Sequence, residues 1–354
     1  MRGLKKRGED FAARGRFPCA FLVGLCLCAL FSRSLSAMPS AETAAAPETA
    51  AVLPVETILP PHVKVPESVV QGDVLSVLVN GKGIDKLIAK LADKEGKEVL
   101  SCRGFLFSRG ELINGEEPPP ADSAEAAGSW ALVAGISSVQ APGDYKLLVH
   151  AVYDSGREFA HEESVKILGR NFVREDIPLN EAMSSLRADS DPRKAAESRE
   201  LWALLSSVNP ASVYHAGKLV LPIAEGFRET SFFGDRRTFL YTDGGKGHSV
   251  HYGIDYATPR GTPVHAAGAG KVVMAKQRVL TGFSVVIEHL PGVYSLYYHM
   301  DKLDVKEGQM VHTGDKIGDS GFTGLATGPH LHWEVRAAGN AVEPKTLMGS
   351  PFIP

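Results

Sequence analysis

Cysteine is scarce in this sequence, with four among 354 residues. Three of them, Cys19, Cys26 and Cys28, lie in the first 37 residues, so Cys102 alone remains beyond that point. Residues 38–354 therefore cannot form an internal disulfide bond, and a metal site in them cannot depend on a set of thiolates. Cys102 is expected to be a small residue of a hydrophobic core.

Long hydrophobic runs are also missing. The longest, residues 17–31, has 15 residues, whereas a membrane-spanning helix needs about 20. Basic residues precede this run, and the small-residue sequence Ser-Leu-Ser-Ala follows it at 34–37. This order is typical of a secretory signal peptide, so we predict that residues 1–37 are a signal peptide and that the protein is exported to the periplasm or cell envelope. Membrane contact is expected only if this apolar segment is retained as an anchor.

The sequence has no large excess of one charge, because its formal net charge is -3. Residues 1–37 hold seven basic and two acidic side chains, which leaves 31 basic and 39 acidic side chains in the rest. That negative remainder has no electrostatic attraction for nucleic acid, and we expect no nucleic-acid partner. Hydrophobic residues make up 44% and charged residues 22%, which excludes a fully disordered chain and a protein with many membrane spans.

The sequence divides by composition into a leader, a linker and two β-rich regions, which predicts a mainly β fold. Residues 38–61 are rich in Ala, Pro, Glu and Thr and are predicted to be a flexible tether. Residues 62–169 are predicted to form an immunoglobulin-like β-sandwich, because short apolar segments alternate with turn signals. The strands are expected at residues 74–79, 130–133, 145–152 and 165–168, with a surface loop around residues 118–120. This domain has no catalytic spacing and is interpreted as a spacer or a docking module for other cell-envelope proteins.

Residues 170–215 are predicted to be a short helical connector. Asp191 is suited to cap a helix that starts at Pro192 and continues to Leu205. The apolar face of this helix is expected to pack on a neighbouring domain and consists of Leu201, Trp202, Leu204 and Leu205. From residue 216 to the end, glycines and paired β-branched residues predict a second β domain.

Eight of the twelve histidines lie between residues 248 and 332, in this second domain. His251 and Asp255 are four apart, His299 follows two tyrosines, and His330 and His332 are two apart. Residues two apart on a strand face the same way, so His330 and His332 can reach one centre. Catalytic zinc uses three protein ligands and keeps one position open. His251, Asp255 and one histidine of the pair supply three, which leaves the other histidine and His299 for proton transfer. A site of nitrogen and oxygen donors suits zinc, although affinity alone leaves copper and nickel open.

The segment from Leu221 to Pro344 resembles the M23 (LytM-like, lysostaphin-type) zinc peptidases over their whole catalytic domain. The matching stretches, in chain order, are Ser231-Phe232-Phe233-Gly234-Asp235-Arg236-Arg237, His251-x-Gly-x-Asp255, Gly261-Thr262-Pro263-Val264-x-Ala266-Ala267, Tyr297-x-His299, Val305-Lys306-x-Gly308-Gln309-x-Val311 and Thr327-Gly328-Pro329-His330-Leu331-His332. Six blocks in order are more specific than either histidine motif alone. One departure is Phe283, where relatives often have Asn, so a substrate contact from that position is in doubt.

This resemblance implies an antiparallel β barrel-sandwich peptidase domain at residues 216–354, with a groove over one Zn²⁺ per chain. It assigns the metal to His251, Asp255 and His332 and the catalytic histidines to His299 and His330. The implied activity is hydrolysis of peptide bonds in the stem or cross-bridge peptides of bacterial peptidoglycan, for cell-wall remodelling.

Two other functions remain open at this point. Some LytM-like domains bind and activate a cell-wall amidase without cutting, but these typically lack metal ligands that this sequence retains. The chain is also compatible with a peptidoglycan-binding module whose connector blocks the groove. Histidines outside the motifs are expected to be structural, as is the Asp235-Arg236-Arg237 run, whereas His248 is close enough in sequence to His251 to be considered as a groove residue.

Overall fold

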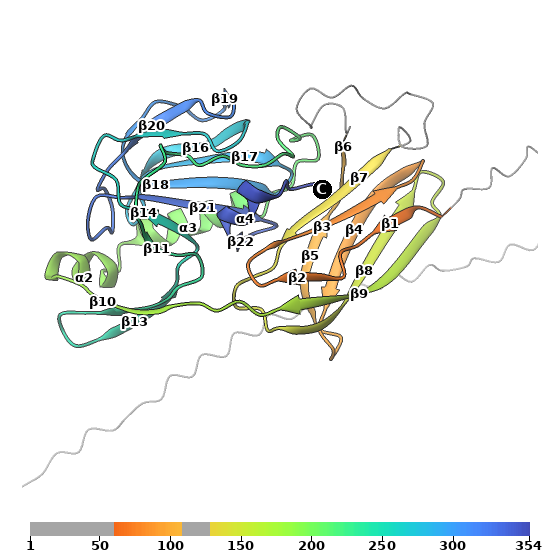
Figure 1. The fold of residues 1–354 in the computed structure, drawn as a ribbon, viewed down its shortest axis with the longest axis horizontal. Helices are drawn as coiled ribbons and strands as arrows, with labels where there is room; N and C mark the ends of the chain where they lie inside the picture. The colour runs from red at the N-terminus through yellow and green to blue at the C-terminus, as the bar shows by residue number, and fades with distance from the viewer. Residues whose placement is uncertain (1–59, 108–127) are drawn as a thin grey trace, which may run out of the picture. The chain divides into compact units, whose positions relative to one another are not determined.

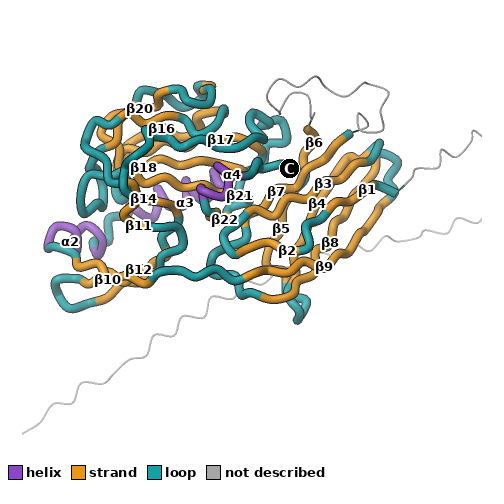
Figure 2. Tube along the Cα trace, viewed as in Figure 1, coloured by secondary structure: helices purple, strands orange, loops and turns teal. Residues whose placement is uncertain are grey.

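The computed structural model describes residues 60–107 and 128–354. The predicted signal peptide, almost all of the predicted tether and the predicted loop around residues 118–120 lie outside these residues. The described part is mainly β, as predicted, and strands dominate its trace (Figure 1, Figure 2). Within it, no helix combines the length and hydropathy needed to cross a membrane.

The N-terminal part consists of two sheets that share a hydrophobic core. One sheet has the order β1 (His62–Lys64), β3 (Val74–Asn80), β7 (Ser129–Gly135), β6 (Phe105–Phe107). The other has the order β2 (Ser68–Val70), β9 (Glu158–Leu168), β8 (Gly143–Tyr153), β4 (Ile84–Ala92), β5 (Glu98–Arg103). Alternate residues of β8, among them Leu147, Val149 and Ala151, are buried in this core, as the period of a half-buried strand requires.

The connector contains more structure than the sequence predicted. The helix α3 (Pro192–Leu205) is present, and the Asp191 carboxylate accepts a hydrogen bond from the Arg193 N–H as its cap. Its Leu205 is buried among apolar residues of the sheet that follows, but Trp202 is 60% exposed, so its predicted place on the packed face is wrong. Two further elements, β10 (Arg174–Pro178) and α2 (Glu181–Ala188), precede α3 and were not predicted.

The C-terminal part is built on a ten-stranded sheet, drawn in teal to blue in Figure 1. Its main path is β11 (Glu229–Ser231), β14 (Gly253–Tyr256), β21 (Leu331–Ala337), β18 (Val293–Leu303), β17 (Gly282–Leu290), β16 (Gly270–Arg278), β19 (Met310–Val311). Strands β15 (Pro263–His265), β20 (Lys316–Ser320) and β22 (Asn340–Val342) pair beside this path, and α4 (Pro344–Gly349) follows. Among the residues that the structure describes, the largest fully buried side chain is that of Trp333, on β21.

A separate three-stranded sheet joins the connector to the C-terminal part. Strand β10 pairs in parallel with β12 (Arg236–Leu240), which pairs in antiparallel with β13 (Lys246–Val250). The helix α2 is fixed to the same hairpin, because the Ser184 hydroxyl accepts a hydrogen bond from the Thr242 N–H at 3.2 Å. Both β10 and α2 therefore attach to the β12–β13 hairpin, which directly precedes the first histidine motif at His251.

Candidate active site

Three neighbouring strands bring the predicted site residues together. In the register of β14 with β21, Asp255 is opposite His332, and in the register of β18 with β21, Tyr298 is opposite His332. His251 lies just before β14, where its N–H donates to the Asp235 carbonyl at 2.9 Å. His299 lies within β18, and His330 lies just before β21.

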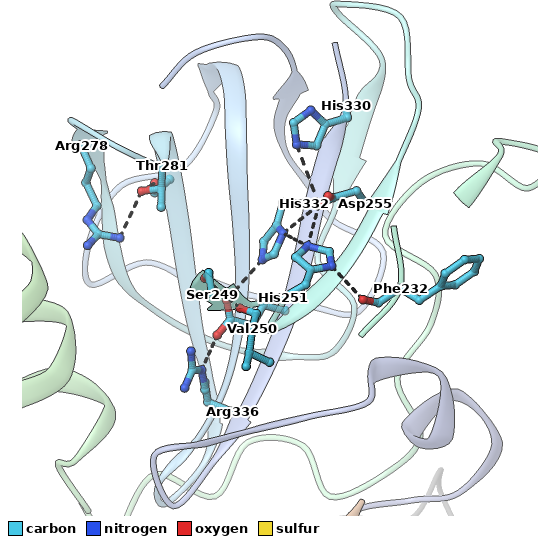
Figure 3. A network of polar contacts seen from close by, with 12 residues as sticks. Phe232, Ser249, Val250, His251, Asp255, Arg278, Thr281, His330, His332 and Arg336 are labelled. Atoms are coloured by element: carbon cyan, nitrogen blue, oxygen red, sulfur yellow. Dashed lines mark hydrogen bonds and ion pairs between the residues drawn. The ribbon is translucent and has the colours of Figure 1, made fainter. Parts of the chain in front are cut away.

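His251, Asp255 and His332 form a compact cluster (Figure 3). His251 Nε2 is 3.0 Å from Asp255 Oδ1 and 3.0 Å from His332 Nδ1, and His332 Nδ1 is 2.8 Å from Asp255 Oδ1. All three residues are buried. One donor atom from each of three residues thus converges on one point.

The outer nitrogen of each clustered histidine has its own acceptor. His251 Nδ1 is 2.9 Å from the Phe232 carbonyl, and His332 Nε2 is 3.3 Å from the Glu334 carboxylate. Since carbonyl and carboxylate oxygens accept, these outer nitrogens hold the protons. When both rings are neutral, the inner nitrogens present lone pairs to each other and to a carboxylate oxygen, an arrangement that a cation stabilises.

The donor chemistry therefore fits a metal ion. Two imidazole nitrogens and one carboxylate oxygen are a mixed set that zinc accepts, with three protein ligands as in a catalytic site. Burial lowers the pKa of His332, but Asp255 and Glu334 outweigh it and raise that pKa to about 9, so the surroundings of this ring favour a positive charge. Burial raises the pKa of Asp255, but His251 and His332 outweigh it and hold that pKa well below its usual value.

His299 and His330 lie beside the cluster, and each ring has its Nδ1 atom directed at the backbone. Each directs Nδ1 at a backbone carbonyl, Thr323 for His299 and Gly328 for His330, at 2.8 Å in both cases. Their ring centroids are 4.6 Å apart, and His330 Nε2 is 3.8 Å from Asp255 Oδ1. Because the carbonyls fix the proton on Nδ1, each Nε2 is free to accept a proton.

Electrostatics keep both of these histidines neutral. Burial, followed by the neighbouring His330, lowers the pKa of His299 to about 3. Burial also lowers the pKa of His330, against the attraction of Asp255. His299 also has a backbone φ of 60°, a region that few residues other than glycine adopt and that is concentrated at functional sites.

Arg237 is a site residue that sequence reasoning missed. Its Nη2 donates to Asp255 Oδ2 at 2.8 Å, and its Nε is 3.6 Å from the Glu175 carboxylate. The guanidinium thus binds Oδ2 of Asp255, whereas the histidines contact Oδ1. The sequence interpretation treated the whole Asp235-Arg236-Arg237 run as structural. That description suits Asp235, whose carboxylate accepts from the Phe232 N–H at 2.8 Å.

Glu334 is a second site residue that sequence reasoning missed, although the alternation of side chains along a strand could have predicted it. Residues 332 and 334 are two apart on β21, so Glu334 faces the same way as His332. Its carboxylate also pairs with Arg336. A carboxylate that accepts from the outer nitrogen of a metal-binding histidine fixes the orientation of the ring.

A groove of about 540 Å³ lies over the cluster. Its wall includes all five predicted site residues. It also includes residues of the connector, in or between the unpredicted β10 and α2, namely Glu175, Ile177, Leu179, Met183 and Arg187. The connector therefore shapes one part of the groove. His248, considered from sequence, is exposed on β13 and is not among the residues that line it.

Phe283 and the other histidines take no part in the cluster. Phe283 packs against the hydrophobic core of the C-terminal part. His289 is fully buried between the Ala269 carbonyl and the Ser295 hydroxyl, which agrees with the structural role expected for it.

Comparisons with known proteins find relatives of the segment that contains this cluster. Residues 249–344 match the family described as Peptidase family M23. The peptidoglycan DD-endopeptidase ShyB of Vibrio cholerae is 41% identical over 124 residues, which cover 34% of this chain and 28% of that protein. The DD-carboxypeptidase/endopeptidase Mpg of Neisseria meningitidis is 44% identical over 98 residues, covering 28% of this chain and 23% of that protein. The matched segment thus spans about a quarter of these relatives' length.

A solved structure extends the likeness beyond this segment. A crystal structure described as a peptidase M23 from Pseudomonas aeruginosa aligns with a TM-score of 0.52 and 26% identity, covering 79% of this chain and 95% of that one. The family match includes His251, Asp255, His299, His330 and His332, and the chain therefore contains a peptidase domain of family M23.

Proposed function

We propose that this protein is a zinc-dependent endopeptidase that hydrolyses peptide bonds in the stem or cross-bridge peptides of bacterial peptidoglycan. The observation that supports it most strongly is the convergence of three donor atoms from His251, Asp255 and His332 beside two neutral histidines. ShyB, a relative named as a peptidoglycan DD-endopeptidase, supports the substrate class. Export to the periplasm or cell envelope, from the predicted signal peptide, belongs to the same proposal.

The residues of the groove divide the chemistry between them. Zn²⁺ bound by His251, Asp255 and His332 supplies Lewis acidity and the means to make water nucleophilic at neutral pH. His299 and His330 each offer an unprotonated Nε2 that can accept a proton from the attacking water. The water oxygen bonds to the carbonyl carbon, the C–N bond breaks, and the same proton passes to the leaving amine.

Arg237 and Glu334 maintain this geometry from outside the reaction. Arg237 holds Asp255 Oδ2, so Oδ1 remains directed at the two histidines. Glu334 holds His332 Nε2, so Nδ1 remains directed at the same point. Neither residue needs to contact the substrate for these roles.

A non-hydrolytic regulator that activates a cell-wall amidase is the competing function. Such a protein needs the groove but has no need for a metal site with two flanking histidines. In this chain the ligand set and both histidines lie together in one groove, which favours hydrolysis.

The test is turnover of a purified cross-linked muropeptide by the full chain, with zinc per chain measured by elemental analysis. We expect about one zinc per chain. His299→Ala is expected to keep zinc and folding and to lose roughly 10²–10⁴-fold in turnover, because a proton-transfer group is removed. His248→Ala is the matched control, since His248 is exposed outside the groove. No turnover by the zinc-loaded wild type, together with stimulation of an added amidase, would favour the regulator instead.

A further inference from the structure

The acidic side chains of the groove are all paired within the protein. Three carboxylates line it, namely Glu175, Asp255 and Glu334. Glu175 and Asp255 both lie by Arg237, and Glu334 pairs with Arg336. The groove therefore presents no unpaired acidic side chain to a substrate among the described residues.

The basic side chains are not balanced in the same way. Three arginines line the groove, namely Arg187, Arg228 and Arg237. Arg237 has its carboxylate partners, whereas Arg187 and Arg228 have no ion pair with any residue in 60–107 or 128–354. The unpaired charge that faces a substrate here is positive.

Arg187 is held in a defined orientation. Its guanidinium carbon lies 4.0 Å from the centroid of the Phe239 ring, and its Nε donates to the Tyr241 hydroxyl at 3.1 Å. Among the described residues, no hydrogen bond engages its two Nη atoms. Their parallel N–H groups match the two oxygens of a carboxylate. Because the contacts with Phe239 and Tyr241 already order this side chain, binding a carboxylate costs less conformational entropy.

The element that presents Arg187 is also fixed. The Asn180 side chain caps α2 by accepting from the Met183 N–H at 2.9 Å, and the Leu179 N–H donates to the Leu240 carbonyl at 2.9 Å. Arg228 differs, because its side chain is exposed and, within the part of the chain that the structure describes, no such contact holds it. Of the two unpaired arginines, Arg187 has the more preorganised site.

We propose that Arg187 binds a free carboxylate of the substrate peptide, away from the bond that is cut, and so selects stem peptides that carry one. This inference rests on the proposed function, since it concerns the groove of the same peptidase site. The shared chemistry is a carboxylate, which can be a peptide C-terminus or an acidic side chain. Charged hydrogen bonds are stronger than neutral ones, so the carboxylate is expected to improve kcat/KM by roughly 10- to 100-fold.

The experiment compares three synthetic cross-linked peptides with one sequence: one with free carboxylates, one with the C-terminus amidated, and one with the acidic side chain amidated. For the full wild-type chain, we expect one of the two amidations to lower kcat/KM by roughly 10- to 100-fold, which identifies the carboxylate that is bound. In Arg187→Gln, the free and amidated peptides are expected to be cut at equal, low rates. The ratio of two substrates within one variant does not depend on how much of that variant is folded.

Arg187→Lys is the second variant, because it keeps the positive charge and the aliphatic stem but loses the two parallel N–H groups of the guanidinium. Most of the difference in kcat/KM between the free and the amidated peptides is expected to disappear. Arg228→Gln and Arg157→Gln, which removes an exposed arginine on the β8–β9 turn, are the controls and are expected to discriminate as the wild type does. Equal cutting of all three peptides by the wild type, full discrimination in Arg187→Gln, or its loss in Arg228→Gln would each overturn the proposal.

A binding measurement separates this inference from the proposed function. Fluorescence anisotropy of the same labelled peptides with His299→Ala, and with His299→Ala/Arg187→Gln, needs no turnover. If the wild type cuts none of the peptides, the proposed function fails. A carboxylate preference in binding that Arg187→Gln removes would still support the inference, and equal binding of all three peptides would overturn it.

Discussion

The two histidines of the 330/332 pair differ in the nitrogen that each directs at Asp255. His332 uses Nδ1, at 2.8 Å from Asp255 Oδ1, whereas His330 uses Nε2, at 3.8 Å from the same atom. The spacing of two residues leaves them nearly equivalent on one face of a strand. The difference arises because Glu334 holds the outer nitrogen of His332, while the Gly328 carbonyl holds that of His330.

This difference predicts distinct effects of removing each ring. His332→Ala is expected to lose zinc sharply and activity with it, because two protein ligands remain. His330→Ala is expected to keep zinc while turnover collapses. The measurement is zinc per chain after dialysis against a weak chelator, together with muropeptide cleavage. The reverse pattern of zinc retention would exchange the two roles, and zinc loss in both variants would mean that the two histidines share the metal.

His289 is a buried titratable residue outside the site. Its Nδ1 is 2.7 Å from the Ala269 carbonyl, and its Nε2 is 2.8 Å from the Ser295 hydroxyl. Burial lowers the pKa of His289 from 6.5 to about 3. Between these values the unfolded chain binds a proton that the folded chain does not, so the free energy of unfolding falls as pH falls from about 6.5 toward 3.

His289→Gln, which keeps a donor and an acceptor but does not titrate, is expected to reduce this pH dependence. One group contributes a slope of about 1.4 kcal/mol per pH unit. From about pH 7 to about pH 5, the wild type should lose about 2 kcal/mol more than the variant. Urea unfolding of both proteins with chelator present measures this difference and removes the contribution of metal release. Equal losses in the two proteins would show that His289 is not titrating as expected.

The sequence located the site residues better than it located the groups that orient them. The spacing of His251 with Asp255 and of His330 with His332, together with the resemblance, predicted the residues that the structure brings together; their individual roles stay predictions. Glu334 follows from strand alternation alone. Arg237 does not, because its contact with Asp255 depends on how the β12–β13 hairpin lies against β14, which no local pattern encodes.

At the scale of elements, a turn beside β17 supports the position of His299. Gly282 begins β17 with φ at 64°, and a Cβ there would lie 2.1 Å from Thr323 Oγ1 and 2.6 Å from the Thr323 carbonyl carbon and oxygen. The Thr323 carbonyl is the group that accepts from His299 Nδ1. A side chain at residue 282 would therefore displace the partner that fixes His299.

Gly282→Ala is expected to lower kcat roughly 10- to 100-fold while zinc stays bound, because small displacements of a positioned catalytic group are costly. Gly308→Ala is the matched control, since it has a φ of 86° and nothing within 4 Å of its Cβ. Both variants have the same kind of backbone strain, and only the first meets Thr323. Muropeptide turnover and bound zinc are the two readouts, and equal turnover in the two variants would argue against this role of Thr323.

Secondary structure followed the sequence where local signals were strong. The cap at Asp191 and Pro192 predicted α3 correctly, because these signals depend on adjacent residues. Strand β10 has the sequence Arg-Glu-Asp-Ile-Pro, which lacks the alternation of apolar and polar residues that predicts a strand. It exists as a strand because β12 supplies its hydrogen-bond partners, from Arg174 opposite Arg236 to Pro178 opposite Leu240. Such an element cannot be predicted before the tertiary pairing is known.

At the scale of the whole molecule, the sandwich and the peptidase domain share one apolar cluster. Strands β3 and β7 bury one face in the sandwich core, and the other face contributes Leu78, Ala131 and Val133 to the core of the C-terminal part. The two parts are also joined by polar contacts: the Glu343 N–H donates to the Gly72 carbonyl at 2.7 Å, and the Ser76 hydroxyl donates to the Phe352 carbonyl at 2.5 Å. The fivefold division of the chain made from composition stays a prediction, but these contacts argue that the two β regions unfold together.

Arg170 is central to this contact because it links two acids from different domains. Its Nη2 is 2.6 Å from Asp73, its Nη1 is 3.3 Å from Glu343, and its side chain is 21% exposed. Burial raises the pKa of both Asp73 and Glu343, with Arg170 acting against it. Without the guanidinium, two half-buried carboxylates would face each other with no cation between them.

Arg170→Met is therefore expected to lower the free energy of unfolding by on the order of 2 kcal/mol near pH 7, because an unpaired buried charge costs more than the pair contributes. The loss should shrink at about pH 4, since protonated carboxyls no longer repel. Urea unfolding reports on both parts through tryptophan, with Trp130 in the sandwich and Trp333 in the peptidase domain. The wild type is expected to unfold in one transition, and Arg170→Met in a broader one or in two, whereas Arg157→Met, at an exposed turn, should not change the curve. If the wild type already unfolds in two separate steps, the shared core does not couple the domains.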